Sequence, residues 1–106
     1  MTAAIRALND ELRRNPDKGI VVITPGVAAF GDEIVQSLFR TIATYDDFPR
    51  ENDPYGEHDF GAFEVEGQKI FWKVDYYDKA LNAHSPDPSD PKVTERVMTV
   101  MLASEY

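Results

Sequence analysis

The fold of this chain is decided by residues 52–78, which read NDPYGEHDFGAFEVEGQKIFWKVDYYD. Two strand-like runs, residues 59–65 and 69–77, flank the dipeptide Glu66-Gly67. A glycine in the second turn position suits a two-residue loop of type I′, the turn that best matches the twist of paired strands. We therefore predict an antiparallel hairpin over this stretch.

A two-residue loop would also set the pairing of the two strands, whereas a three-residue loop would shift the partner strand by one residue and exchange its faces. The two-residue loop places Val65 opposite Gln68 and Gly61 opposite Trp72, and continued outward it places His58 opposite Asp75. Paired residues share a face, and faces alternate along a strand, so the hairpin has one core face and one mixed face. The predicted core face holds Phe63, Val65, Ile70, Trp72 and Val74, with Gly61 leaving room under the indole. The predicted mixed face holds Phe60, Ala62, Glu64, Lys69, Phe71, Lys73, Asp75, Tyr77 and His58.

The segments outside the hairpin predict three helices and one more strand. Apolar residues at helical spacing predict one helix over residues 3–15 and a second that begins at Asp32 as N-cap. The β-branched run of residues 20–23 predicts a short strand buried on both faces. Asp90-Pro91 is typical of a helix start, and the spacing of the apolar residues after it predicts a last helix. Those apolar residues are Val93, Val97, Val100 and Met101.

This α-β-α-β-β-α order favours an α+β fold with a small, largely antiparallel three-stranded sheet covered by helices. A length of 106 residues suits a single domain over residues 1–106. The turn Thr24-Pro25-Gly26 resembles a phosphate-binding turn, but it has one glycine and no lysine after it, so we interpret it as a tight turn. The aromatic residues Tyr55, Trp72, Tyr76 and Tyr77 fit either core packing or a stacking platform for a base or sugar.

The net charge of −8, from 19 acidic and 11 basic side chains, repels polyanions. Direct binding of nucleic acid and of anionic membranes is therefore not expected. The chain has no cysteine, which excludes disulfides and thiolate zinc sites. The first residues have no apolar signal core, and no run reaches membrane-spanning length, so we expect a cytoplasmic protein. We also expect no cofactor.

Acidic side chains concentrate in residues 46–59, a stretch with prolines and a glycine that predicts a long loop. One interpretation of this loop is an ordinary solvated surface. The other is a docking surface for a basic protein partner, in which clustered carboxylates imitate phosphates and aromatic side chains act as anchors. The candidate binding residues are Asp46, Asp47, Phe48, Glu51, Asp53, Tyr55, Glu57 and Asp59.

A rival interpretation places chemistry at the start of the hairpin. His58 beside Asp75 would resemble a general base oriented by a carboxylate, with Lys73 and Tyr77 in support. The sequence offers no nucleophile in a typical context. A metal site would draw on Glu57, His58, Asp59 and His84. The plainest alternative is that His58 holds the loop to the sheet.

Several long phrases of the sequence resemble a bacterial family catalogued as a domain of unknown function, number 3768. The phrases are TPGVAA at 24–29, NDPYGEHDFGAFEV at 52–65, FWKVDYYD at 71–78, SPDPSDP at 85–91 and VMTVMLASEY at 97–106. The resemblance implies a small alphaproteobacterial protein, often borne on plasmids and other mobile elements. It implies no activity and no catalytic residue, and it favours accessory roles such as countering host defence or regulating plasmid functions.

Size, acidity and the missing nucleophile together predict a non-enzymatic interaction protein. We expect a mobile-element accessory factor that binds a basic surface of a nucleic-acid-handling or defence complex. The alternative is a small hydrolase or metal-dependent enzyme centred on His58 and Asp75.

Overall fold

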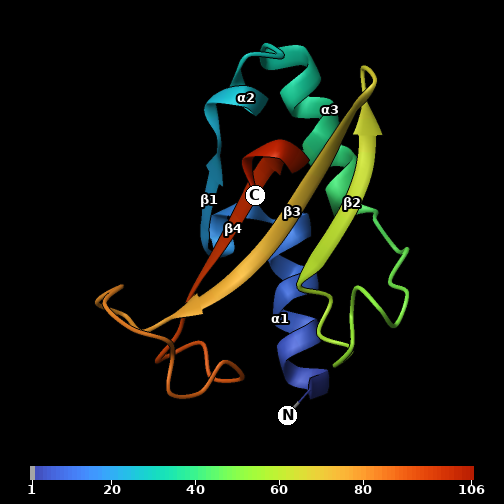
Figure 1. The fold of residues 1–106 in the computed structure, drawn as a ribbon. Helices are drawn as coiled ribbons and strands as arrows, with labels where there is room; N and C mark the ends of the chain where they lie inside the picture. Colours follow the sequence, from blue (N-terminus) through green and yellow to red (C-terminus); the bar gives the residue numbers. More distant parts are fainter. Residues whose placement is uncertain (1) are drawn as a thin grey trace.

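The computed structural model describes residues 2–106 and has an α+β fold, in which helices pack on one face of a four-stranded sheet (Figure 1). The helices are α1 (Thr2–Arg14), α2 (Pro25–Ala28) and α3 (Asp32–Ala43), with short 3₁₀ turns η1 (Pro16–Lys18) and η2 (Ala103–Glu105). The strands are β1 (Ile20–Ile23), β2 (Phe60–Val65), β3 (Gln68–Tyr77) and β4 (Glu95–Leu102). Among the described residues, no helix is both long and apolar enough to cross a membrane.

The sheet has the order β1-β4-β3-β2 and is mixed. Strand β4 pairs in parallel with β1 and antiparallel with β3, and β3 pairs antiparallel with β2. The expected sheet of three largely antiparallel strands therefore has one strand too few. Strand β1 is also an edge strand with Val22 43% exposed, so the prediction that it is buried on both faces was wrong.

The predicted last helix is strand β4. The spacing of Val93, Val97 and Val100 fits a helix, but Arg96, Met98 and Val100 alternate and are buried on the side of the helices. The outward residues Val97 and Met101 of this central strand are apolar as well, so its apolar residues do not show a clean two-residue period and can imitate a helical stripe. Its valines and threonine are also residues that strands prefer.

The hairpin prediction is confirmed in both turn and register. Glu66 and Gly67 have φ of 52° and 76°, the positive values that a type I′ turn requires. Val65 pairs with Gln68, and the ladder runs without a slip to Phe60 opposite Lys73. Because the register is right, the predicted core face is right as far as the ladder extends.

The core lies between the helices and the inner face of the sheet. Leu12 of α1 and Leu38 and Ile42 of α3 pack on the inward residues of β3 and β4, and Trp72 at its centre is fully buried. Gly61 on β2 makes room for the indole as expected, since a Cβ atom there would lie 2.2 Å from Trp72 Nε1. Both long amphipathic helices therefore bury their apolar stripes against one layer of strands.

Candidate functional site

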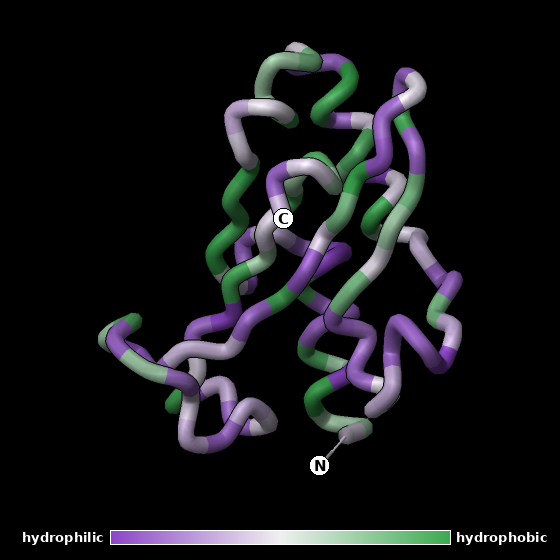
Figure 2. Tube along the Cα trace, in the orientation of Figure 1, coloured by the Kyte–Doolittle hydropathy of each residue, from purple (hydrophilic) through white to green (hydrophobic). Residues whose placement is uncertain are grey.

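The candidate docking surface is the acidic loop, defined here as residues 46–59, which connects α3 to β2. Figure 2 shows it mostly in hydrophilic colours, at the end where β2 begins. Three hydrogen bonds join it to α1: Arg6 Nε to the Gly56 carbonyl at 2.8 Å, Asn9 Nδ2 to the Glu57 carbonyl at 3.1 Å, and His58 Nδ1 to Asp10 Oδ1 at 3.0 Å. The loop therefore has a defined position on the helix.

Asp53 holds the loop from inside and is 8% exposed. Its Oδ1 accepts hydrogen bonds from the backbone N–H groups of Glu57, at 2.9 Å, and His58, at 3.2 Å. Its own N–H donates to the Pro49 carbonyl at 2.9 Å. A carboxylate that satisfies loop N–H groups shapes the backbone, so Asp53 is placed to organise the candidate surface from inside.

Phe48 likewise points into the protein. Its ring is stacked on His58 with 3.8 Å between centroids and 4° between planes, and it meets Tyr45 and Trp72 edge to face. The guanidinium of Arg13 lies 5.3 Å from the same ring. Phe48 therefore joins the loop to the core through aromatic and cation–π contacts.

The remaining members of the predicted surface divide by exposure. Asp46, Asp47 and Glu51 are exposed, and Tyr55 is 76% exposed. Glu57 and Asp59 are half-buried at the end of the loop that enters β2. The predicted binding residues that face outward are thus three carboxylates and one aromatic ring, and Arg50, Asn52 and Pro54 are exposed beside them.

The predicted pair of His58 and Asp75 does not form. The last hydrogen bond beyond the β2–β3 ladder is from the Val74 N–H to the Asp59 carbonyl, and His58 has a φ of 56° that turns the chain toward α1. Its imidazole contacts Asp10 instead, with Asp53 Oδ2 at 4.0 Å, while Asp75 binds Lys73 Nζ at 2.7 Å on the other face of the sheet. The catalytic reading of His58 with Asp75, Lys73 and Tyr77 lacks its central contact.

The metal reading also lacks its geometry. Residues 2–106 contain no group of three or more His, Asp or Glu side chains placed to hold an ion, so Glu57, His58, Asp59 and His84 do not converge. His58 faces α1, whereas His84 forms an isolated bridge with Tyr77 at the far end of β3. The positive φ of His58 turns its side chain toward α1, which separates it from Asp59 and His84.

Four of the predicted residues do meet, in a pocket of about 290 Å³ at the end of the sheet. Its lining comprises Asp59, Val74, Asp75, Tyr76, Tyr77 and His84. Burial, with Glu57 nearby, raises the pKa of Asp59 above its ordinary value. The pocket can exchange protons and attract cations, but its only hydroxyl groups are phenols.

A family model described as "Protein of unknown function (DUF3768)" matches residues 23–105. The chain belongs to this family. The matched segment includes the acidic loop, the hairpin and β4, and α1 lies before it. No curated protein and no solved structure matches the chain of this DUF3768 protein.

The DUF3768 protein also has a buried polar cluster that the sequence analysis missed, made of Asn9, Glu57, Tyr76 and Arg96. Asn9 Nδ2 donates to the Tyr76 phenol at 2.8 Å, the phenol donates to Glu57 Oε1 at 2.8 Å, and Arg96 Nε donates to Asn9 Oδ1 at 2.9 Å. Burial, with the hydrogen bond to Glu57, raises the pKa of Tyr76, so the phenol remains a donor. The signal for this cluster is an arginine at an inward position of a strand, which the prediction of a last helix after Asp90-Pro91 hides.

Proposed function

We propose that this protein is a small acidic interaction protein that docks the outward residues of its acidic loop on a basic surface of a partner protein. The observation that supports this most directly is that some side chains of the loop turn inward while others face solvent. Asp53 and Phe48 turn inward and hold it, whereas Asp46, Asp47, Glu51 and Tyr55 face solvent. A held loop with an exposed aromatic side chain is more than a solvated linker.

The held position lowers the entropic cost of binding. A loop already fixed by α1 loses little freedom when a partner arrives, so more of the contact energy becomes affinity. Exposed carboxylates attract a basic surface and raise the association rate, and an exposed Tyr is a common interface anchor. In this proposal Asp46, Asp47 and Glu51 guide the encounter and Tyr55 packs on the partner.

The partner we expect is a basic protein of a nucleic-acid-handling or defence complex, met in the cytoplasm. Surfaces that bind nucleic acid present Lys and Arg spaced to meet phosphates. A rigid array of carboxylates can occupy such a surface in place of the phosphates, while the net charge of −8 disfavours direct binding of nucleic acid. The expected effect is therefore competition for a basic groove.

The enzymatic alternative has less support. His58 is engaged with Asp10 and stacked on Phe48, contacts that suit a residue holding the loop. The pocket that gathers Asp59, Asp75 and His84 has no aliphatic hydroxyl or thiol in its lining. Acid–base groups without a nucleophile or a metal set favour the binding role.

The decisive experiment is affinity capture from host lysate with a triple charge reversal of exposed loop residues, Asp46→Lys, Asp47→Lys and Glu51→Lys. Asp53 stays unchanged because it holds the backbone of the loop. We expect at least one basic protein to be retained by the natural protein, to be released by added salt, and to be lost with the variant. Tyr55→Ala should lower its retention without changing the charge.

The matched control is Glu11→Lys, Glu64→Lys and Glu66→Lys, which reverses three exposed acidic residues outside the loop. This control changes the net charge equally, so it separates a localised surface from overall acidity. If every captured protein binds both triple variants alike, or resists salt, the docking proposal is wrong.

A further inference from the structure

Arg96 is a buried cation whose charge has no carboxylate partner. It is 6% exposed, and none of the ion pairs within residues 2–106 involves it. Nε donates to Asn9, and one terminal nitrogen donates to the Pro88 carbonyl. The other terminal nitrogen makes no hydrogen bond within the part of the chain that the structure describes. Buried charges are normally paired, so this guanidinium has capacity for an anion.

None of the neighbours of Arg96 in the buried cluster forms an ion pair with it. The guanidinium carbon of Arg96 lies 5.2 Å from the centroid of the Tyr76 ring. Tyr76 is a neutral phenol, and Asn9 is a neutral amide. Glu57 is reached only through these two groups, since it accepts from Tyr76 and not from Arg96. Burial accordingly lowers the pKa of Arg96. The charge of Glu57 offsets this lowering only in part, and no carboxylate of the network forms an ion pair with Arg96.

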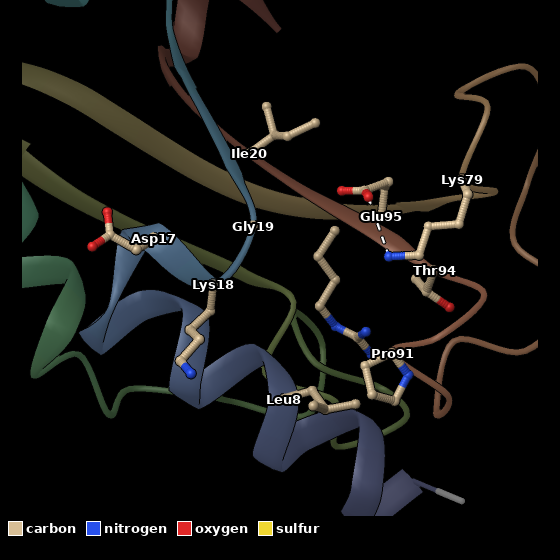
Figure 3. A pocket seen from close by; sticks show the side chains of 10 residues that line it. Leu8, Asp17, Lys18, Gly19, Ile20, Lys79, Pro91, Thr94 and Glu95 are labelled. Carbon is tan, nitrogen blue, oxygen red and sulfur yellow. Dashed lines mark hydrogen bonds and ion pairs between the residues drawn. The ribbon is translucent and has the colours of Figure 1, made fainter.

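A pocket of about 250 Å³ opens beside Arg96, between α1, η1 and the start of β4 (Figure 3). Its lining is Leu8, Asp17, Lys18, Gly19, Ile20, Lys79, Pro91, Thr94, Glu95 and Arg96. In Figure 3, Lys18 and Lys79 lie on opposite sides of it, above Leu8 of α1. This volume suits a small molecule or ion.

The charges around this pocket leave a cationic surplus. Lys79 Nζ is paired with Glu95 at 3.2 Å, and the carboxylate of Asp17 points away from the other labelled side chains (Figure 3). Lys18 takes part in no ion pair among the described residues. The lining thus holds three cations, Lys18, Lys79 and Arg96, against the carboxylates of Asp17 and Glu95, a surplus of one positive charge in a chain of net charge −8.

We propose that this pocket binds the oxyanion group of a small molecule, a phosphate or a carboxylate. The unpaired terminal nitrogen of Arg96 and the amine of Lys18 donate to the oxyanion, and Lys79 adds long-range attraction from the rim. The free terminal nitrogen carries two N–H groups, so it can donate two charge-assisted hydrogen bonds to one oxyanion. This site lies apart from the acidic loop and does not depend on the docking function.

The test is a titration of the ¹⁵N-labelled full chain, followed by NMR, with sodium phosphate and separately with sodium malonate. Sodium chloride keeps the ionic strength constant. We expect saturable shifts of the amide signals of Lys18, Gly19, Glu95 and Arg96. Binding of phosphate alone assigns a phosphate group, binding of malonate alone assigns a carboxylate, and binding of both assigns the shared oxyanion chemistry.

Variants locate the site. Lys18→Gln should weaken binding about fivefold because it removes one charged donor, and Lys79→Gln should weaken it less. Lys69→Gln removes the same charge from the exposed end of the hairpin and should leave the affinity unchanged. Arg96→Lys keeps the charge but removes the guanidinium nitrogen that is proposed to donate to the oxyanion. If it does not fold, the exposed Lys18 variant still decides.

Three results would each overturn the proposal. They are shifts that do not saturate, identical shifts with chloride alone, and equal weakening by Lys18→Gln and Lys69→Gln. The triple reversal of the acidic loop should leave oxyanion binding intact. A failure of the docking proposal in the capture experiment is therefore independent of the result of this titration.

Discussion

Nδ1 of His58 lies 3.0 Å from Oδ1 of Asp10, although 48 residues separate the two in sequence. The same oxygen accepts a hydrogen bond from the buried guanidinium of Arg13 at 2.7 Å. Arg13 in turn donates to the carbonyls of Ile42 and Tyr45. One carboxylate oxygen of α1 thus links the end of the acidic loop to the segment that leaves α3.

Asp10→Asn should destabilise the protein at neutral pH by about 1–3 kcal/mol, because it replaces charge-assisted contacts and leaves Arg13 buried without its carboxylate. Burial opposes ionisation of Asp10, but the hydrogen bonds from Arg13 and His58 prevail and hold its pKa below the ordinary 3.8. Its stabilising effect is therefore present above about pH 4 and is lost as the pH falls through the lower folded-state pKa.

Denaturant titrations of the natural protein and Asp10→Asn between about pH 2 and pH 7 measure this effect. The two free energies of unfolding should converge in acid. Glu11→Gln, an exposed neighbour on the same helix, should change the stability little at any pH. If the free energies of unfolding of the natural protein and Asp10→Asn differ by a constant amount across this pH range, the stabilisation does not depend on ionisation of Asp10.

Asp59→Asn should stabilise the protein at neutral pH, by about 0.5 kcal/mol because the group is half exposed. Burial, followed by repulsion from Glu57, raises the pKa of Asp59, so the ionised form is disfavoured in the folded state. The destabilisation by ionised Asp59 is absent below its ordinary pKa of 3.8 and grows as the pH rises through the higher folded-state pKa. Melting temperatures at about pH 3 and pH 7 test the sign, and a gain at the lower pH alone would refute it.

Gly61→Ala should cost about 2–3 kcal/mol, because its Cβ would overlap the fully buried indole of Trp72. Urea unfolding measures the cost. Gly31→Ala is the control: a Cβ there meets nothing within 4 Å, and only its φ of 90° opposes substitution. In a Trp72→Phe background the cost of Gly61→Ala should fall, and an unchanged cost would show that the clash is not the cause.

Phe48→Ala and Tyr55→Ala should separate stability from docking. Removing Phe48 deletes contacts with Trp72 and His58 and should lower the free energy of unfolding by about 2–3 kcal/mol. It should also speed hydrogen exchange in the acidic loop. Tyr55→Ala should change the free energy of unfolding by less than about 0.5 kcal/mol, because the Tyr55 side chain is 76% exposed. A marked loss of stability with Tyr55→Ala would place that ring in the fold and not at an interface.

The turn and the register of the hairpin could be predicted because the information that sets them is local. Glu66-Gly67 selects the turn, and the turn with the two-residue alternation sets the register. Strand β4 could not be predicted in this way, since its neighbours β1 and β3 come from distant parts of the chain. Pairing with both of them turns an apparent helical stripe into a central strand.

The candidate surface was predictable in composition but not in orientation. A run of acidic residues with Phe48 and Tyr55 says nothing about which ring faces solvent. The helix α1 decides, because its Arg6, Asn9 and Asp10 bind the loop and thereby set its inner side.

By itself, the sequence determined the net charge, the hairpin with its two faces, the first strand and the two long helices. These features follow from composition and from contacts between residues close in the chain. Only the tertiary structure decided that the sheet has four strands, that His58 meets Asp10 and not Asp75, and that Arg96 lies buried beside a pocket. Each of those depends on groups more than 40 residues apart, whose meeting is set by how the helices and strands pack together.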